Sequence, residues 1–295
     1  MKILITGATG QLGSDCKEVL KQRFEIIPLG SKDLDITSRG DVEDLIETTA
    51  PEVILNCAAF TRVDGCETQQ DSAWRVNVDG PHNLARAAKK QGIHLIHISS
   101  DYVFDGEKPV PEPYTETDET NPLSYYGKTK WEGERAVRRG TDHHTILRTA
   151  WLYGIEGQNF LKTMLKLILK EPAKEIRVVN DQFGSPTWSY RLAQQIAGLM
   201  EAGAQGTYHA TSEGYGTWYE LATDFLDQMH IPHALTPCTT AEYPTPARRP
   251  INSILENRRL KKANLNRMKD WRSDLAQFIH RFRSRLMDEM KEEQE

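Results

Sequence analysis

The sequence predicts an α/β protein built on a doubly wound parallel sheet, because short apolar runs alternate with helical patterns through the first 150 residues. A glycine-rich turn after the first apolar run supports this prediction, since strand, turn and helix open such a fold. The expected strands cover residues 2–6, 24–29, 53–57, 93–98 and 145–149. Apolar residues at helical spacing predict helices near residues 12–20, 41–49, 73–91 and 123–137.

The pattern loosens after Trp151, where we expect a smaller region. Its expected helices cover residues 160–169, 191–200, 217–229 and a stretch from residue 271 onward, and its expected strands cover residues 176–179 and 206–210. We therefore expect residues 1–150 to form one domain. Residues 151–295 are expected to form mainly a second domain, with some segments returning to the first.

Length, charge and composition exclude several classes of protein. The chain has 295 residues, and its net charge of −5 is spread over mixed acidic and basic residues, which argues against a nucleic-acid partner. No apolar run approaches the ~20 residues of a membrane helix, and we expect no signal peptide, because the sequence opens on a strand pattern at Lys2 without a basic leader or cleavage site. The four cysteines lack metal-binding or redox spacing. We expect a cytoplasmic protein with no membrane partner.

The turn after the first strand carries glycines at Gly7, Gly10 and Gly13. A tight turn from strand to helix needs residues without a Cβ, and the free N–H groups at the helix start attract a pyrophosphate. Gly13 would also let the helix lie close to the sheet. An ordinary flexible turn is the alternative. The position of this turn favours an NAD(P)-binding Rossmann domain.

The end of the second strand bears on the choice of cofactor. NAD-binding folds place a carboxylate there to bind the ribose 2′-hydroxyl, whereas Gly30, Ser31 and Lys32 follow the strand here. Ser31 and Lys32 could bind a 2′-phosphate, so the sequence favours NADPH over NADH. Asp33 and Asp35 follow closely, which leaves a solvated loop as the alternative.

A hydroxyl group follows the fourth expected strand, and a phenol and an ammonium group lie on the next expected helix. Ser100 follows the carboxyl end of the strand expected over residues 93–98, and Tyr126 and Lys130 are four residues apart, on one face of the expected helix. Such a set suits the reduction of a carbonyl group. Tyr126 would donate the proton, Lys130 would bring the pKa of the phenol toward the working range, and Ser100 would orient the carbonyl.

Longer motifs extend the match over nearly the whole chain. They are Thr6-Gly7-x-x-Gly10-x-x-Gly13, Asn56-x-Ala58-Ala59, Ser99-Ser100-Asp101-Tyr102-Val103-Phe104-Asp105-Gly106, Tyr126-x-x-x-Lys130, Arg148-Thr149-Ala150-Trp151-Leu152-Tyr153-Gly154, Asn159-Phe160-x-x-Thr163-Met164, Asp181-Gln182-Phe183-Gly184-Ser185-Pro186-Thr187, Trp218-Tyr219 and Tyr243-Pro244-x-Pro246-Ala247-x-Arg249-Pro250. The chain resembles the extended short-chain dehydrogenases/reductases and, within them, the dTDP-4-dehydrorhamnose reductase family.

The resemblance implies NADPH- or NADH-dependent reduction of the 4-keto group of dTDP-4-dehydro-β-L-rhamnose. The product would be dTDP-L-rhamnose, made for surface polysaccharide. Ser100, Tyr126 and Lys130 would be catalytic, and the last two would also contact the cofactor. The resemblance further implies these cofactor contacts: Gly10, Gln11, Leu12, Asp35, Ile36, Ala59, Phe60 and Thr61.

Substrate contacts are expected from Ser100, Asp101 and Trp151. The flat indole of Trp151 suits a pyranose ring, with a core tryptophan as the alternative. Arg248 or Arg249 is expected to neutralise the diphosphate, because a guanidinium group binds phosphate in bidentate fashion.

Several departures from the family pattern leave questions open. The family often has Thr where Ser100 stands and His where Phe60 stands. It often has Asp where Gly30 stands, and the lack of that acid puts NADH use in doubt. Some members bind a divalent cation such as Mg²⁺ at a dimer contact. A homodimer is therefore an open alternative, and the sequence assigns no metal ligand.

Two rival functions remain. The first is a 4,6-dehydratase or epimerase of the same fold, although Tyr102 stands where a dehydratase needs an acid. The second is an NADP-binding regulatory subunit resembling the methionine adenosyltransferase β subunit.

Overall fold

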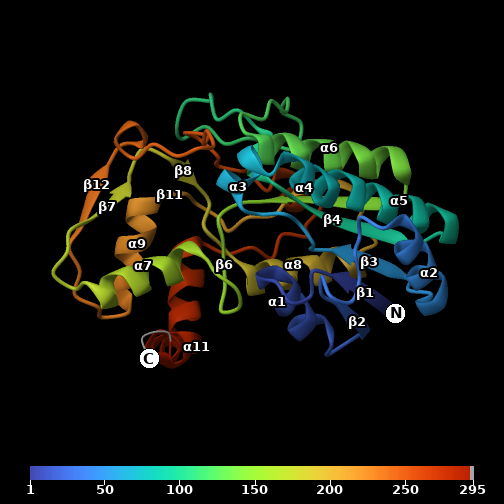
Figure 1. Ribbon diagram of the computed structural model, residues 1–295, viewed down its shortest axis with the longest axis horizontal. Coiled ribbons are helices and arrows are strands. Elements are labelled where there is room, and N and C mark those ends of the chain that lie inside the picture. Colours follow the sequence, from blue (N-terminus) through green and yellow to red (C-terminus); the bar gives the residue numbers. More distant parts are fainter. Residues whose placement is uncertain (293–295) are drawn as a thin grey trace.

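The computed structural model describes residues 1–292, and at its centre lies a sheet of six parallel strands (Figure 1). The strand order is β10-β5-β4-β3-β1-β2. The strands are β1 (Lys2–Thr6), β2 (Glu25–Leu29), β3 (Val53–Asn56), β4 (His94–Ser100), β5 (His144–Thr149) and β10 (Gly206–His209). From β1 the chain passes to β2 on one side and then to β3 on the other. The carboxyl ends of β1 and β3 therefore form the crevice where such sheets bind ligands.

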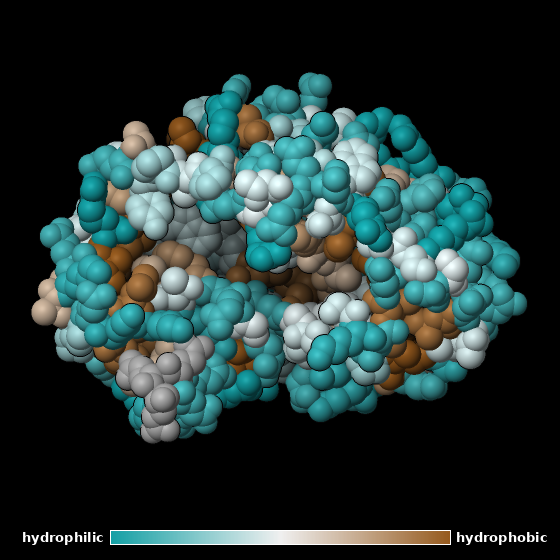
Figure 2. Space-filling view, viewed as in Figure 1, coloured by the Kyte–Doolittle hydropathy of each residue, from teal (hydrophilic) through white to brown (hydrophobic). Residues whose placement is uncertain are grey.

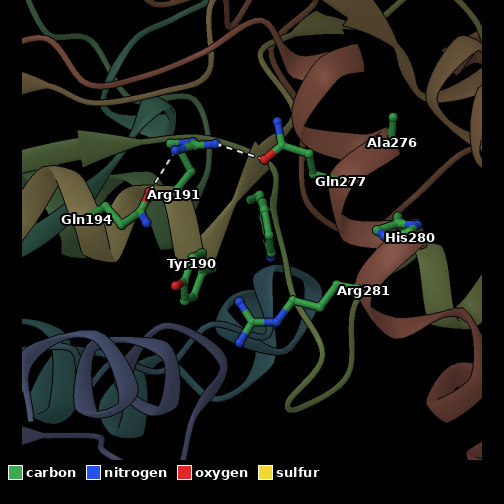
Figure 3. A pocket seen from close by; sticks show the side chains of 8 residues that line it. Tyr190, Arg191, Gln194, Ala276, Gln277, His280 and Arg281 are labelled. Atoms are coloured by element: carbon green, nitrogen blue, oxygen red, sulfur yellow. Dashed lines mark hydrogen bonds between the residues drawn. The ribbon is translucent and has the colours of Figure 1, made fainter. Parts of the chain in front are cut away.

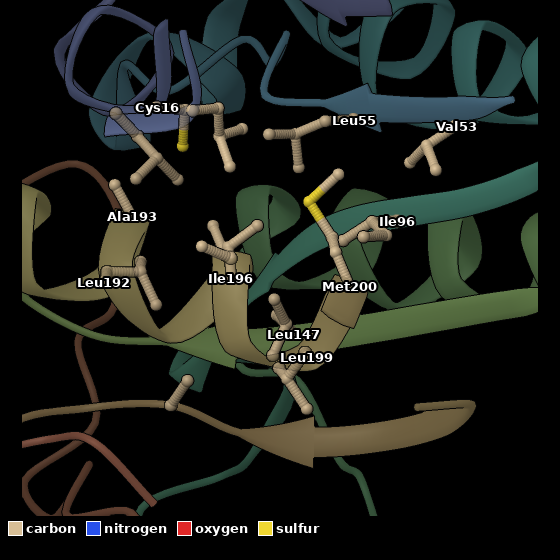
Figure 4. Packing of buried hydrophobic residues seen from close by; sticks show 14 of the residues in the cluster. Cys16, Val53, Leu55, Ile96, Leu147, Leu192, Ala193, Ile196, Leu199 and Met200 are labelled. Carbon is tan, nitrogen blue, oxygen red and sulfur yellow. The ribbon is translucent and has the colours of Figure 1, made fainter. Parts of the chain in front are cut away.

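Helices cover both faces of this sheet, which confirms the predicted fold class. Helices α1 (Gln11–Leu20) and α8 (Ser189–Glu201) pack on one face, and α2 (Arg39–Thr49), α5 (Gly80–Gln91) and α6 (Tyr125–Gly140) pack on the other. Alternate strand residues serve the two faces, since Ile3 belongs to the first apolar cluster and Leu4 to the second. Figure 4 shows Ile196 of α8 among the side chains of Leu55 and Leu147.

The second half of the chain also contributes a strand and a helix to the parallel sheet and its covering helices. Strand β10 pairs with β5, and α8 packs against α1. The boundary at residue 150 stays a prediction.

A smaller lobe is built around a separate apolar cluster. Its helices are α7 (Phe160–Lys170), α9 (Trp218–Gln228) and α11 (Trp271–Glu292). Three two-stranded pairs complete it: β6 (Leu152–Tyr153) with β9 (Thr187–Trp188), β7 (Ile176–Val179) with β12 (Leu235–Cys238), and β8 (Phe183–Gly184) with β11 (Gly216–Thr217). Figure 2 shows the surface hollowed between this lobe and the region of α1, with apolar residues on the floor of the hollow.

The helix expected over residues 73–91 is interrupted by a π-helical segment. It consists of α4 (Gln70–Trp74), the π segment Arg75–Asp79 and α5. The π turn presents the side chain of Asn77 toward two neighbouring segments. Its Oδ1 accepts from the Phe60 N–H (2.8 Å), and its Nδ2 donates to the Phe60 carbonyl (3.1 Å) and to Thr129 Oγ1 (3.0 Å). Such π turns are frequent at functional sites. The other short helices in residues 1–292 are α3 (Val63–Thr68), α10 (Arg258–Lys262) and two 3₁₀ turns, Asp101–Val103 and Thr240–Glu242.

Candidate active site

The glycine turn has the close geometry that the sequence predicts. Gly7 has φ of +65°, and a Cβ on Gly13 would lie 2.2 Å from the Gly7 carbonyl oxygen. No side chain caps the start of α1 at Gly10. The amide groups of the first turn are therefore available to an anionic ligand at the carboxyl end of β1.

The segment after β3 forms the other side of the crevice. The backbone of Ala58 packs directly against Gly7, since a Cβ added there would lie 2.7 Å from the Ala58 nitrogen. Ala59 and Phe60 are half-buried and Thr61 is exposed. Asn77 fixes the Phe60 backbone in place. The role of Asn77 was not predicted from the sequence. An asparagine within a helical pattern does not indicate the π turn that directs its side chain toward Phe60.

The loop after β2 brings a carboxylate close to the strand end. Asp33 folds back so that its Oδ2 accepts from the Gly30 N–H (2.7 Å). Ser31 and Lys32 are exposed. Gly30, Ser31 and Lys32, which directly follow β2, include no acidic residue. The turn nevertheless places the Asp33 carboxylate beside Gly30, at the end of the strand. This finding bears on the choice between NADPH and NADH.

Asp35 and Ile36, which follow in the same loop, differ in their exposure to solvent. Asp35 is exposed, and hydrogen bonds from Thr37 lower the pKa of its carboxyl. Ile36 is buried and packs against Gly80 at the start of α5.

Ser100 ends β4, and Tyr126 and Lys130 lie four residues apart on α6, as the sequence predicts. Helix α6 starts at a fixed place because Ser124 Oγ accepts from the Gly127 N–H (3.1 Å) and Glu67 Oε1 accepts from the Tyr125 N–H (2.8 Å). The phenol of Tyr126 therefore enters the site from the first turn of a capped helix.

The environment of these groups shifts their protonation. Burial raises the pKa of Tyr126, and a hydrogen bond with Ser100 partly opposes that shift. Lys130 is buried and donates from Nζ to the Ile98 carbonyl (2.7 Å). Burial lowers the pKa of Lys130 to about 8, with the negative charge of Glu134 opposing. At neutral pH, Tyr126 is thus a protonated phenol on the same helix face as a charged ammonium group.

Asp101 lies beside Ser100. Ser100 Oγ donates to Asp101 Oδ1 (2.7 Å) and accepts from the Tyr102 N–H (3.2 Å). Burial raises the pKa of Asp101 to about 6. Its Oδ2 is buried without a hydrogen-bond partner within residues 1–292. That oxygen is a ready acceptor for a hydroxyl group of a ligand.

Trp151 is half-buried and has φ of +46°. Its indole stacks on Trp218, with ring centroids 3.6 Å apart and an interplanar angle of 6°. Gly184 lies against the same indole, since a Cβ there would come within 2.3 Å of it. The ring is thus held by the small lobe, and its contact with a sugar stays a prediction.

Arg249 is engaged with a carboxylate across the chain. Its Nη2 lies 2.9 Å from Asp64 Oδ2 and its Nη1 lies 3.1 Å from Asp64 Oδ1. Arg248 is exposed. Sequence reasoning did not foresee Asp64, which lies 185 residues before Arg249.

A buried cluster of charged residues around Glu134 lies next to Ser99, the neighbour of Ser100. Glu134 accepts from Ser99 Oγ (2.6 Å) and binds the Arg148 guanidinium through both oxygens (2.8 Å each). Burial raises the pKa of Glu134, but Arg148 and Arg138 outweigh it and bring the pKa to about 2. Glu134 lies four residues after Lys130 on the same helix face, a spacing that could have been noticed in the sequence.

A separate pocket of about 640 Å³ opens between α8 and α11 (Figure 3). Arg191 within it donates to Gln194 (2.7 Å) and Gln277 (3.3 Å). This pocket contains none of the residues predicted to bind cofactor or substrate.

In residues 1–292, no helix is both long and apolar enough to cross a membrane. Over that same range, no group of three or more His, Cys, Asp or Glu side chains is arranged to hold a metal ion.

The sheet, the glycine turn and the Ser-Tyr-Lys set define a short-chain dehydrogenase/reductase of the Rossmann type. The chain belongs to the family described as the RmlD substrate binding domain, which matches residues 1–284. The predicted resemblance is therefore confirmed. It is a family of dTDP-sugar 4-ketoreductases.

Solved structures and curated relatives agree with this assignment. A dTDP-4-dehydrorhamnose reductase from Clostridium acetobutylicum is 44% identical with a TM-score of 0.92, covering 95% of this chain and 99% of its own. The same enzyme from Bacillus anthracis, in complex with NADP, is 36% identical with a TM-score of 0.91 at the same coverage. A dTDP-4-keto-6-deoxy-D-glucose reductase from Streptomyces niveus is 38% identical over 93% of this chain and 95% of its own length.

Proposed function

We propose that this protein reduces the 4-keto group of dTDP-4-dehydro-β-L-rhamnose to give dTDP-L-rhamnose, with NADPH as the reductant. The observation that carries the proposal is the position of Tyr126 and Lys130 on the face of α6 beside Ser100, at the carboxyl edge of the sheet. The close similarity to dTDP-4-dehydrorhamnose reductases supports the choice of substrate.

The cofactor fits the residues that surround the crevice. The uncapped start of α1 and the turn at Gly7 and Gly13 would receive the pyrophosphate. Ala59, Phe60 and Thr61 would border the dinucleotide on the β3 side. When bound, NADPH supplies the hydride. The NADP in the Bacillus anthracis structure supports this assignment.

The catalytic work of the chain is to orient the sugar and to supply a proton. Ser100 hydrogen-bonds the keto oxygen, and Tyr126 donates its phenolic proton to that oxygen as negative charge develops there. The Lys130 ammonium stabilises the phenolate that remains. Asp101 Oδ2 accepts from a sugar hydroxyl, and the Trp151 indole packs beside the ring.

NADPH is preferred to NADH in this proposal because Ser31 and Lys32 are exposed at the end of β2. Asp33 opposes that preference, since its carboxylate would repel a 2′-phosphate and accept from a 2′-hydroxyl. We therefore expect NADH also to be used, with lower efficiency. A higher kcat/KM with NADH than with NADPH would contradict the preference.

The test of the proposed substrate is a comparison of keto-sugars. Purified protein is supplied with NADPH and either dTDP-4-dehydro-β-L-rhamnose or dTDP-4-dehydro-6-deoxy-D-glucose, and products are identified by NMR. We expect dTDP-L-rhamnose and a much higher kcat/KM for the first substrate. Preference for the second, which the Streptomyces niveus relative makes a specific alternative, would reassign the sugar.

A regulatory subunit is the alternative outside catalysis. Binding of NADPH without turnover of either keto-sugar would support it. A cytoplasmic location and a homodimer stay predictions.

A further inference from the structure

We propose that Asp64 forms an ion pair with Arg249 before substrate binds. The diphosphate of the incoming sugar nucleotide then displaces the Asp64 carboxylate from the Arg249 guanidinium. This inference rests on the proposed function, because it requires a nucleoside diphosphate as part of the substrate. It assigns Asp64 as a positioning residue of the substrate site.

The guanidinium group of Arg249 is hydrogen-bonded to other residues of the chain in this structure. Both oxygens of Asp64 accept from its guanidinium, at 2.9 and 3.1 Å. Thr245 Oγ1 and the Ala247 carbonyl accept from the same group. The Asp64 carboxylate occupies the Nη1/Nη2 edge of the guanidinium, so a phosphate can bind that edge in bidentate fashion only after the carboxylate has left it.

Arg249 lies close to the catalytic residues. Burial raises the pKa of the Tyr102 phenol, and the positive charge of the nearby Arg249 opposes that shift. The Tyr102 ring in turn meets the Tyr126 ring edge-on, with centroids 5.4 Å apart. Tyr102, which follows Ser100 and Asp101 directly in the chain, therefore lies near both Arg249 and the proposed proton donor Tyr126.

The Asp64 carboxylate keeps other contacts if Arg249 changes its partner. Asp64 lies on α3, and Glu67 of the same helix accepts from the Tyr125 N–H at the start of α6. Asp64 Oδ1 also accepts from the Ala247 N–H (3.1 Å). If Arg249 leaves, the carboxylate keeps that backbone donor and its contact with water, because 42% of its side chain is exposed. Breaking the pair therefore leaves no buried unpaired charge.

The exchange is favourable for reasons of charge and geometry. A partly exposed ion pair such as Asp64–Arg249 contributes little to stability, so breaking it costs little. A diphosphate carries more negative charge than one carboxylate and offers several oxygens in the geometry that a guanidinium fits. Asp64 also lowers the cost of having Arg249 near Tyr102 before substrate arrives, because it neutralises the cation.

The experiment measures binding of dTDP alone by isothermal titration calorimetry, so it does not depend on turnover. The variants are Asp64→Asn, Arg249→Met, the double variant and Arg248→Met, with the exposed Arg139→Met as the matched control. We expect Asp64→Asn to bind dTDP several-fold more tightly. We expect Arg249→Met to bind it at least about tenfold more weakly, as for loss of a charged hydrogen bond. The double variant should match Arg249→Met.

Three results would overturn the inference. They are unchanged or weaker dTDP binding in Asp64→Asn, tighter binding that persists in the double variant, and a loss of affinity in Arg248→Met instead of Arg249→Met. A second measurement needs no substitution at Asp64. In arginine-labelled wild-type protein, the NMR signal of the Arg249 side chain, assigned with Arg249→Lys, should shift when dTDP is added, and an unshifted signal contradicts the exchange.

The failure of this inference can be told apart from failure of the proposed function. Wild-type protein that turns over the keto-sugar, but whose dTDP affinity does not respond to Asp64, removes only the exchange. Wild-type protein that neither binds dTDP nor turns over a keto-sugar removes the proposed function as well.

Discussion

At the scale of single residues, protonation of Lys130 sets the expected pH dependence. Burial lowers its pKa to about 8, so the ammonium form is present below that pH and is lost as the pH rises through it. We expect kcat/KM for reduction to fall above pH 8, because the Tyr126 phenolate then loses its neighbouring cation. The free-enzyme pKa appears in the pH profile of kcat/KM.

The matched variant for this prediction is Lys130→Arg, which keeps its charge at every accessible pH. It should be slower than wild type but without the decline near pH 8. A wild-type profile that stays flat to pH 10 would refute the role given to the Lys130 charge.

At the scale of secondary-structure elements, the π segment Arg75–Asp79 ties the crevice to the catalytic helix. Asn77 satisfies the Phe60 backbone and contacts Thr129 on α6. In Asn77→Ala these groups lose their partners, which costs about 1–3 kcal/mol of unfolding free energy for unpaired buried groups. We also expect weaker NADPH binding, because the segment at Ala59–Thr61 is no longer held.

A suitable control for Asn77→Ala is Asn266→Ala, which removes a hydrogen bond to Glu213 (2.7 Å) outside the crevice. Urea unfolding and NADPH titration should show lower stability in both variants and weaker NADPH binding only in Asn77→Ala. Equal NADPH affinity in the two variants would show that Asn77 stabilises the fold without shaping the crevice.

At the scale of the whole molecule, the predicted boundary at residue 150 can be tested by truncation. Residues 1–150 lack β10 and α8, whose side chains Leu192 and Ile196 cover one face of the sheet. We expect this fragment not to unfold cooperatively, because its sheet would expose that face to water. Circular dichroism during thermal unfolding measures this. A fragment with a sharp transition would support an independent first domain.

The fold and part of the site could be predicted because their signals are local in sequence. Strand periodicity, the turn at Gly7 and the spacing of Tyr126 and Lys130 each lie within a few residues. The pairing of Asp64 with Arg249 could not be predicted, since it depends on a tertiary approach of two distant segments. The contact between the Asp33 carboxylate and the Gly30 N–H could not be predicted either, because it depends on the conformation of the loop after β2.

The central claim is that this protein is a keto-sugar reductase with Tyr126 as its proton donor. The most direct measurement is the consumption of NADPH with dTDP-4-dehydro-β-L-rhamnose, followed by absorbance in wild type and Tyr126→Phe, together with NADPH affinity in both. We expect turnover in wild type and a loss of at least about 100-fold in kcat for the variant, as for removal of a general acid, with NADPH still bound. Equal turnover in the two proteins, or none in a wild type that binds NADPH, would contradict this claim.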